Sequence, residues 1–292
     1  MTGHSQPFSR AGALLFGGAK GIGRAVAREW ARRGARVAIA DIDEAAAHDT
    51  AAAIVAEGGE ALGLAVDVAS DASVAAAASA AEQALGQIDI VLNNVGVVLN
   101  GNPEDIPFAE WQRVLDLNFF AALRGVQYFL PKMLARGSGH IVTTASFAGL
   151  YPYASSRMPY AASKAAVIAM AESLALYLEP RGIRVSCLIP GPVMTGISEG
   201  MKSWSEDCPL RGPGSMLELR LPEEVAVTFS DGMRDGKILI PSDPAVWDIV
   251  RRWAESPDDF IRAKIAEFAA GDDGRPIVSD ALKTKLAAMR NG

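Results

Sequence analysis

The sequence predicts an α/β protein built on a doubly wound sheet of seven parallel strands, with helices on both faces of the sheet. Short apolar runs alternate with longer alanine-rich stretches along most of the chain. The apolar runs are almost continuous instead of alternating with polar residues, which is typical of parallel strands buried on both faces. Parallel strands need crossover connections, and these place the helices on the two faces of the sheet.

The individual elements follow from this alternation. Helices are predicted at residues 22–33, 44–57, 70–85, 108–136 and 159–179. Strands are predicted at residues 13–16, 37–40, 61–66, 88–92, 140–144, 185–189 and 238–240. No linker rich in proline, glycine and serine divides the chain, so we expect a single domain over residues 1–292 with its core at about 10–241.

Residues from about 242 to 292 are predicted to form a helical extension. Trp247, Trp253 and Phe268 belong to an apolar series at roughly helical spacing in segment 245–269, which is interrupted near Pro257, and a last helix is expected at 279–289. Both pieces of the segment look amphipathic, so we expect them to pack onto the body or onto a neighbouring subunit. A cap over a functional site is the alternative.

Composition argues against several kinds of partner. The net charge is −6 and no long lysine and arginine run occurs, so we expect binding neither to nucleic acid nor to an anionic membrane. Cys187 and Cys208 are the only cysteines, and no Cys/His cluster has metal-ligand spacing, so no metal is expected. Residues 1–10 lack the apolar core of a signal peptide and no later run approaches the length of a membrane span, which indicates a cytoplasmic protein.

The first predicted strand leads into a glycine-rich turn and then directly into a helix. Glycine lets the backbone turn sharply and approach a phosphate, and the helix N-terminus offers unpaired N–H groups and a positive dipole end. Any tight turn can use glycine, but its place after the first strand favours a Rossmann-type dinucleotide site. The predicted cofactor-binding residues of this turn are Gly17, Lys20, Gly21, Ile22 and Gly23.

Asp41 ends the second predicted strand, about twenty residues after the glycines. A carboxylate there can accept hydrogen bonds from the adenosine ribose hydroxyls and repel a 2′-phosphate, which favours NAD over NADP. Lys20 argues the other way because it could attract that phosphate. Asp41 could instead cap the next helix, although Asp43 is better placed to do so. We predict NAD as the cofactor.

Tyr160 and Lys164 lie near the start of a long predicted helix. Their i, i+4 spacing places a phenol and an ammonium on one face, a turn apart. A phenol has an ordinary pKa near 10, and a neighbouring ammonium together with an oxidised nicotinamide would favour the phenolate. Tyr-x-x-x-Lys is common by chance, so its weight depends on what surrounds it.

Taken together, the motifs make the chain resemble the short-chain dehydrogenase/reductase family over about residues 10–240, in its compact single-domain form but with an extended C-terminal tail. The motifs occur in the family's order and at close to its spacing. Three departures are local: Phe16 stands in place of a usual threonine, Val95 in place of an alanine, and the loop before Tyr160 is one residue longer than is common. The motifs are Gly17-x-x-x-Gly21-x-Gly23, Asp67, Asn93-Asn94-Val95-Gly96, Asn118, Ser146, Tyr160-x-x-x-Lys164 and Pro190-Gly191.

The resemblance implies a role for each motif residue. Tyr160 would be the general acid/base, and Ser146 would hydrogen-bond the substrate oxygen. Lys164 would bind the nicotinamide ribose and depress the pKa of Tyr160, and Asn118 would support a water-mediated proton relay to Lys164. The remaining cofactor contacts implied are Asp67, Val68, Asn94, Gly96, Pro190, Gly191, Val193 and Thr195.

The resemblance implies hydride transfer between NAD and a small-molecule secondary alcohol or ketone. Aromatic and apolar residues predict a bulky, apolar substrate, aromatic or alicyclic, although a long loop could need such residues merely to pack. The alternatives are an NADPH-dependent carbonyl or 3-oxoacyl reductase and a non-catalytic dinucleotide-sensing protein. Assembly through helices 108–136 and 159–179 would give a homodimer or homotetramer. The predicted substrate-binding residues are Ser146, Phe147, Tyr153, Tyr160, Met194 and Trp204.

Overall fold

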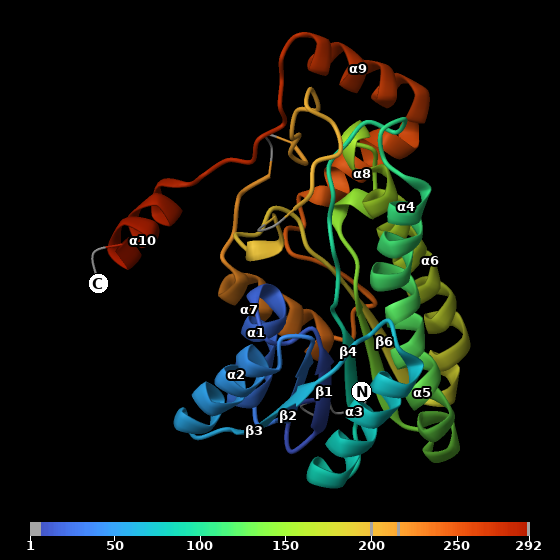
Figure 1. The fold of residues 1–292 in the computed structure, drawn as a ribbon, viewed down its shortest axis with the longest axis vertical. Coiled ribbons are helices and arrows are strands. Elements are labelled where there is room, and N and C mark those ends of the chain that lie inside the picture. The colour runs from blue at the N-terminus through green and yellow to red at the C-terminus, as the bar shows by residue number, and fades with distance from the viewer. Residues whose placement is uncertain (1–6, 199–200, 215–216, 291–292) are drawn as a thin grey trace.

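The structure is a computed structural model that describes residues 7–198, 201–214 and 217–290. Seven parallel strands form one sheet in the order β3-β2-β1-β4-β5-β6-β7, which confirms the predicted fold class (Figure 1). The order reverses beside β1, as in doubly wound sheets. The strands are β1 (Gly12–Phe16), β2 (Arg36–Asp41), β3 (Glu60–Ala65), β4 (Ile90–Asn93), β5 (Gly139–Thr144), β6 (Ile183–Ile189) and β7 (Leu239–Pro241).

Each face of the sheet has its own apolar core. Successive strand residues point to opposite faces, so Ala13 and Leu15 of β1 enter one core while Leu14 and Phe16 enter the other. The first core is covered by α1 (Gly21–Arg32), α2 (Glu44–Ala56) and α7 (Pro222–Arg234). The second is covered by α3 (Asp71–Leu85), α5 (Ala121–Arg136) and α6 (Met158–Leu178), which lie on the other side of the sheet in Figure 1.

Strand register brings the predicted site residues to one edge of the sheet. Phe16 at the end of β1 pairs with Ala40 of β2 and with Asn93 of β4. Asn93 in turn pairs with Thr143 near the end of β5. The turns that follow these strands therefore leave the sheet at one level, and ligands of doubly wound sheets bind at this carboxyl edge.

The helices differ from the prediction in two places. The predicted helix 108–136 is divided into α4 (Phe108–Leu115), a π-helical turn at Asp116–Phe120 and α5. Helix α7 was not predicted. A side chain at Gly232 of α7 would lie 2.5 Å from Ile240 Cγ2, so this glycine allows α7 to pack closely on β7. Short 3-10 turns lie at Phe147–Gly149, Ser155–Arg157, Glu179–Arg181 and Gly196–Ser198.

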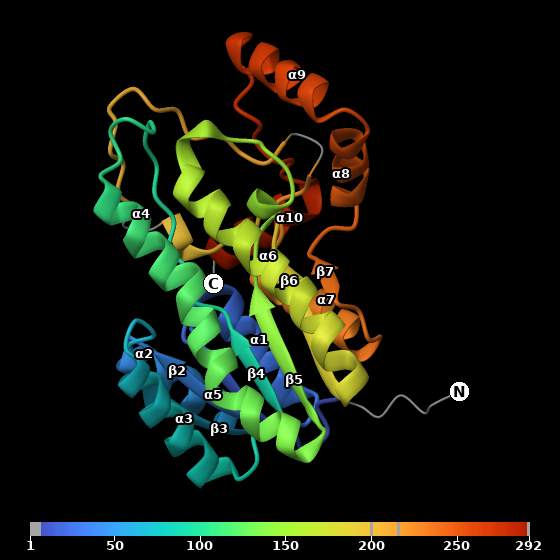
Figure 2. The same ribbon diagram turned by 90° about the vertical axis from the view of Figure 1, so that its right-hand side faces the viewer.

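The C-terminal extension forms α8 (Val246–Glu255), α9 (Pro257–Ala269) and α10 (Asp280–Arg290). Helices α8 and α9 lie near the loops at the carboxyl edge of the sheet, and the chain then crosses to α10 (Figures 1 and 2). Val246 and Ile249 of α8 are buried in the core that α6 covers. The extension therefore packs on the body of the same chain.

One helical stretch, Ser155–Arg181, is long and apolar enough to cross a membrane by length and composition, contrary to the sequence-based expectation that no run approaches this length. Such a stretch is weak evidence for a span because core helices of soluble proteins meet the same criterion. Here it contains α6, whose residues Val167 and Ala171 are fully buried.

Candidate active site

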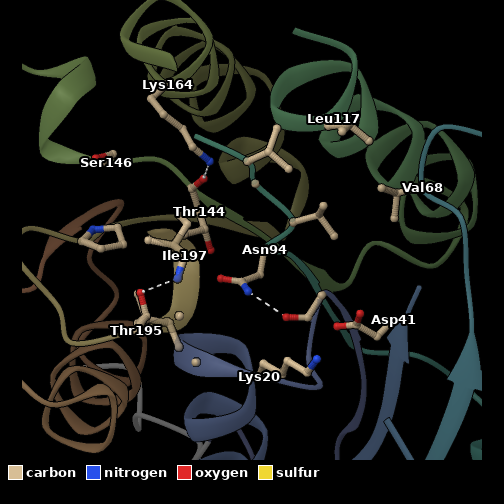
Figure 3. Close-up of a pocket in the computed structure, with 18 of the residues that line it drawn as sticks. Lys20, Asp41, Val68, Asn94, Leu117, Thr144, Ser146, Lys164, Thr195 and Ile197 are labelled. Carbon is tan, nitrogen blue, oxygen red and sulfur yellow. Dashed lines mark hydrogen bonds between the residues drawn. The ribbon is translucent and has the colours of Figure 1, made fainter. Parts of the chain in front are cut away.

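A cavity of about 530 Å³ opens at the carboxyl edge of the sheet (Figure 3). It is formed by the turns after β1, β2, β3, β4, β5 and β6, together with α6 and the turn before α5. Predicted site residues that line it are Gly17, Lys20, Gly21, Ile22, Asp41, Asp67, Val68, Asn94, Gly96, Ser146, Tyr160, Lys164, Pro190, Gly191, Val193 and Thr195. The structure thus brings most of the predicted site together in one hollow.

The glycine-rich turn has the geometry of a phosphate site. Gly17 has a φ of 79°, and a side chain there would lie 2.8 Å from Val95 Cγ2. Helix α1 begins at Gly21 with no acidic residue in its first turn and no side-chain cap from Lys20. Its first N–H groups and its positive dipole end are therefore available to an anion. These residues fit a dinucleotide pyrophosphate.

Asp41 is fixed beside this turn by the backbone. Its Oδ2 accepts from the N–H of Ala19 at 3.1 Å, and its Oδ1 accepts from the N–H of Asp43 at 3.2 Å. Lys20 Nζ lies 2.6 Å from Asp43 Oδ2, at the solvent-exposed rim. Asp43 also caps α2 by accepting from Ala46, so the capping role considered for Asp41 belongs to Asp43. The geometry places the oriented carboxylate of Asp41 in the cavity, and the ammonium of Lys20 is already paired with Asp43 at the cavity mouth.

Three predicted catalytic residues lie on neighbouring elements. Ser146 follows β5, while Tyr160 and Lys164 lie one turn apart on α6, and all three border the cavity. Ser146 is close enough to the Tyr160 hydroxyl to act on its pKa in the lowering direction. Lys164 Nζ is 5.8 Å from the centroid of the Tyr160 ring and donates to the Thr144 carbonyl at 2.9 Å (Figure 3).

Burial dominates the protonation of this group. Burial raises the pKa of Tyr160 to about 12, whereas the neighbouring Ser146 and Arg157 act in the lowering direction. Burial also lowers the pKa of Lys164 to about 8. The direction at Tyr160 is opposite to the one expected from Lys164, because desolvation of the phenolate outweighs the charges around it.

Asn118 lies behind the cavity wall, within the π-helical turn. Its Oδ1 accepts from the N–H of Val97 at 2.7 Å, and its Nδ2 donates to the Val97 carbonyl at 3.0 Å. Nδ2 also donates to Ser163 Oγ at 2.9 Å. The side chain therefore joins three segments, and these hydrogen bonds are structural. The proton relay implied by the resemblance stays a prediction.

The other predicted residues lie outside the cavity lining. A side chain at Gly23 would lie 2.0 Å from the Gly17 carbonyl oxygen, so this glycine serves close helix packing. Phe147 is buried against Gly191. Tyr153 is also buried and is close enough to Tyr160 to influence its pKa. Met194 is exposed, and Trp204 packs against a separate apolar cluster of Leu99, Ile106 and Val114.

Sequence reasoning missed Arg157 and part of the cavity lining. Arg157 lies three residues before Tyr160, and its charge acts to lower the pKa of both Tyr153 and Tyr160. The signal was available, since a cation at the start of a helix is electrostatically unfavourable and needs another reason. Lining residues that were not predicted are Ile42, Val66, Leu117, Thr144, Ala145, Gly196 and Ile197.

Comparison with known proteins identifies the family. The short chain dehydrogenase pattern matches residues 11–206. The chain is 36% identical over 186 residues to a 2,5-dichloro-2,5-cyclohexadiene-1,4-diol dehydrogenase of Sphingobium indicum, covering 64% of this chain and 74% of the relative. It is 33% identical over 234 residues to a D-threitol dehydrogenase of Mycolicibacterium smegmatis, covering 80% and 86%.

Solved structures share the fold, and one of them holds NAD while another holds NADP. A short-chain dehydrogenase/reductase from Burkholderia phymatum, in complex with NAD, has a TM-score of 0.75 at 28% identity, covering 94% of this chain and 99% of that one. A structure from Beutenbergia cavernae with NADP bound at low occupancy has a TM-score of 0.69 at 30% identity, covering 83% and 99%.

The site and these similarities define the class of the protein. The chain belongs to the short-chain dehydrogenase/reductase family, whose members are oxidoreductases that bind a nicotinamide dinucleotide. The relatives act on CH–OH groups of small molecules.

Proposed function

We propose that this protein is an NAD-dependent dehydrogenase that interconverts a bulky, apolar secondary alcohol and its ketone. One observation carries the proposal: Ser146, Tyr160 and Lys164 line the same cavity as the glycine-rich turn and Asp41. The cavity thus joins groups suited to proton transfer with groups suited to hold a dinucleotide.

The proposed chemistry assigns each residue one task. A bound nicotinamide dinucleotide supplies the hydride acceptor for oxidation or the donor for reduction. Tyr160 is protonated at neutral pH and can donate a proton to a carbonyl oxygen during reduction. Ser146 donates a hydrogen bond to that oxygen and stabilises its developing negative charge. Lys164 orients the ribose, and its charge favours loss of the Tyr160 proton in the oxidation direction.

NAD is favoured by the charges around the adenosine end. Asp41 is held in place by two backbone N–H groups, and its carboxylate would repel a 2′-phosphate. Lys20 would attract a 2′-phosphate less strongly than its sequence position suggested, because its ammonium pairs with Asp43.

The substrate class is supported by apolar side chains in the cavity lining. Val97, Leu117 and Ile197 border the cavity, and a relative acts on a cyclic diol. We propose an alicyclic or aromatic alcohol. We also propose a cytoplasmic enzyme that assembles as a homodimer or homotetramer through the surfaces of α4, α5 and α6.

The test measures reduction of NAD⁺ and NADP⁺ across aliphatic, alicyclic, aryl and polyol alcohols. We expect the highest kcat/KM with NAD⁺ and a cyclic or aryl secondary alcohol. Tyr160→Phe should lower kcat by at least about 100-fold, because it removes the proton-transfer group. Tyr177→Phe, at a half-exposed position on the same helix, is the control. A preference for NADP⁺ would refute the cofactor assignment, and unchanged turnover by Tyr160→Phe would refute the mechanism.

A further inference from the structure

The C-terminal extension is joined to the cavity wall through two isolated parallel β-bridges. Val193, which lines the cavity, pairs with Arg220, and Glu218 pairs with Ile277. The N–H of Met194 donates to the Arg220 carbonyl at 2.9 Å. Across the next gap, the N–H of Ile277 donates to the Leu217 carbonyl at 2.8 Å. Segment 217–220 is therefore held between the cavity wall and the tail.

A second set of bonds fastens the tail to residues just before this segment. The N–H groups of Gly212 and Gly214 donate to the carbonyls of Asp273 and Gly274, at 2.8 and 2.9 Å. Arg211 Nη1 donates to the Asp272 carbonyl at 2.7 Å. We name residues 272–277 the tail strap. Together with the Ile277 bonds, these contacts run along its whole length.

The same arginine also ties the strap to α9. The guanidinium of Arg211 lies 3.8 Å from the centroid of the Phe268 ring. Tyr151 donates to the Pro213 carbonyl at 2.8 Å and packs edge-on against Phe260, with ring centroids 6.2 Å apart. Residues 211–214 are thus held by the extension on one side and by the region before Tyr160 on the other.

The wall that these contacts support lies beside the glycine-rich turn. We name residues 193–197 the rim, and four of them line the cavity. A side chain at Gly21 would lie 3.4 Å from Thr195 Cβ and Cγ2, so the rim closely approaches the first residue of α1. Figure 3 shows Thr195 and Ile197 on the opposite side of the cavity from Lys164 and Ser146.

We infer that the tail strap is a positioning element for dinucleotide binding: through segment 217–220 it holds the rim against the glycine-rich turn. The inference rests on the proposed function only for the choice between NAD and NADP. Fixing a binding wall in advance removes an ordering cost from binding, so loosening the strap weakens the complex. The predicted catalytic groups lie in the turn after β5 and on α6, and none of them is bonded to the strap, so turnover of the loaded enzyme is expected to be largely retained.

Three glycines allow a matched test. A side chain at Gly212 would lie 2.3 Å from the Gly274 carbonyl oxygen, and one at Gly274 would lie 2.6 Å from the Gly212 carbonyl oxygen. Gly212→Ala and Gly274→Ala are therefore expected to push the tail strap away from residues 211–214. Gly271→Ala is the control, since Gly271 has a positive φ, as Gly274 does, but its side chain would enter open space. Arg211→Ala loosens the same contact from a partly exposed position and introduces no steric clash.

The measurement is fluorescence titration of each full-length variant with NADH and, separately, with NADPH, followed by kcat and KM. We expect the dissociation constant for the preferred cofactor to rise at least about fivefold in Gly212→Ala, Gly274→Ala and Arg211→Ala, with kcat at saturation within about threefold. Gly271→Ala should stay within about twofold of wild type. Equal binding by Gly271→Ala and all three loosened variants would overturn the inference. A wild-type preference for NADPH would refute only the NAD assignment, because the strap is then tested with NADPH.

Discussion

Lys164 illustrates the cost of placing a charge inside the active site. Lys164 is 2% exposed, and its ammonium donates a hydrogen bond to the Thr144 carbonyl. Burial lowers its pKa from the ordinary 10.5 to about 8. The folded protein therefore holds this proton less tightly than the unfolded chain does, and the charge destabilises the fold at neutral pH.

This shift predicts how stability depends on pH. Between pH 8 and 10.5 the folded protein has released the Lys164 proton while the unfolded chain still binds it, so stability rises with pH. We expect wild type to gain up to about 3 kcal/mol relative to Lys164→Met across this window. Urea unfolding of both proteins at several pH values measures the difference, in which the titration of groups that do not interact with Lys164 cancels. A difference independent of pH would contradict the prediction.

At the scale of residues, the sequence predicted location at the cavity where backbone position decides it, while the roles of these residues stay predictions. Asp41, Ser146 and Thr195 follow strands that end at one level, so their places at the cavity follow from the alternation of strands and helices. The sequence was a poorer guide to side chains whose places are decided by packing. Phe147 directly follows Ser146 but turns beneath Gly191, and Trp204 joins a cluster with Val97. No sequence period distinguishes an aromatic side chain that lines a pocket from one that supports its wall.

At the scale of elements, the π-helical turn was the feature that helical periodicity could not predict. The apolar pattern over residues 108–136 is compatible with a continuous helix, and one extra residue in a turn changes the register without leaving a strong sequence signal. In the structure the turn contains Asn118, which is 1% exposed and bonded to both backbone groups of Val97. The helix is thus interrupted at Asn118, whose side chain ties α6 to the loop after β4.

Asn118→Leu tests this role. The substitution keeps the approximate size of the side chain but leaves the N–H and carbonyl of Val97 without their partner. We expect a loss of about 2–4 kcal/mol in the free energy of unfolding, since each unpaired buried group costs about 1–3 kcal/mol. Gln112→Leu, at an exposed position of α4, is the control and should change stability by less than about 0.5 kcal/mol. Chemical denaturation measures both, and equal stability of the two variants would refute the role.

At the scale of the whole molecule, the two long helical surfaces leave large apolar side chains exposed. Leu176 of α6 is 83% exposed, and Phe108 of α4 is 76% exposed. Large apolar side chains exposed on helices are typical of interfaces. This agrees with the proposal that copies of the chain associate through these helices.

Leu176→Asp should therefore disrupt assembly. A charge placed in an apolar interface lacks a partner, so we expect the mass in solution to fall by about half or more. Val55→Asp, at a 53% exposed position of α2, is the control and should keep the wild-type mass. Size-exclusion chromatography with light scattering makes the measurement. A wild-type monomer, or an unchanged mass for Leu176→Asp, would contradict the proposed assembly.

The tail strap also divides the molecule into parts that open separately. It joins Leu217 to Ile277, about sixty residues apart, through a few backbone bonds near the surface, whereas the sheet is buried between two cores. Such surface contacts open by local fluctuation at a fraction of the free energy needed to unfold the sheet. The protein can thus lose and regain the wall around its cofactor within the lifetime of one folded molecule.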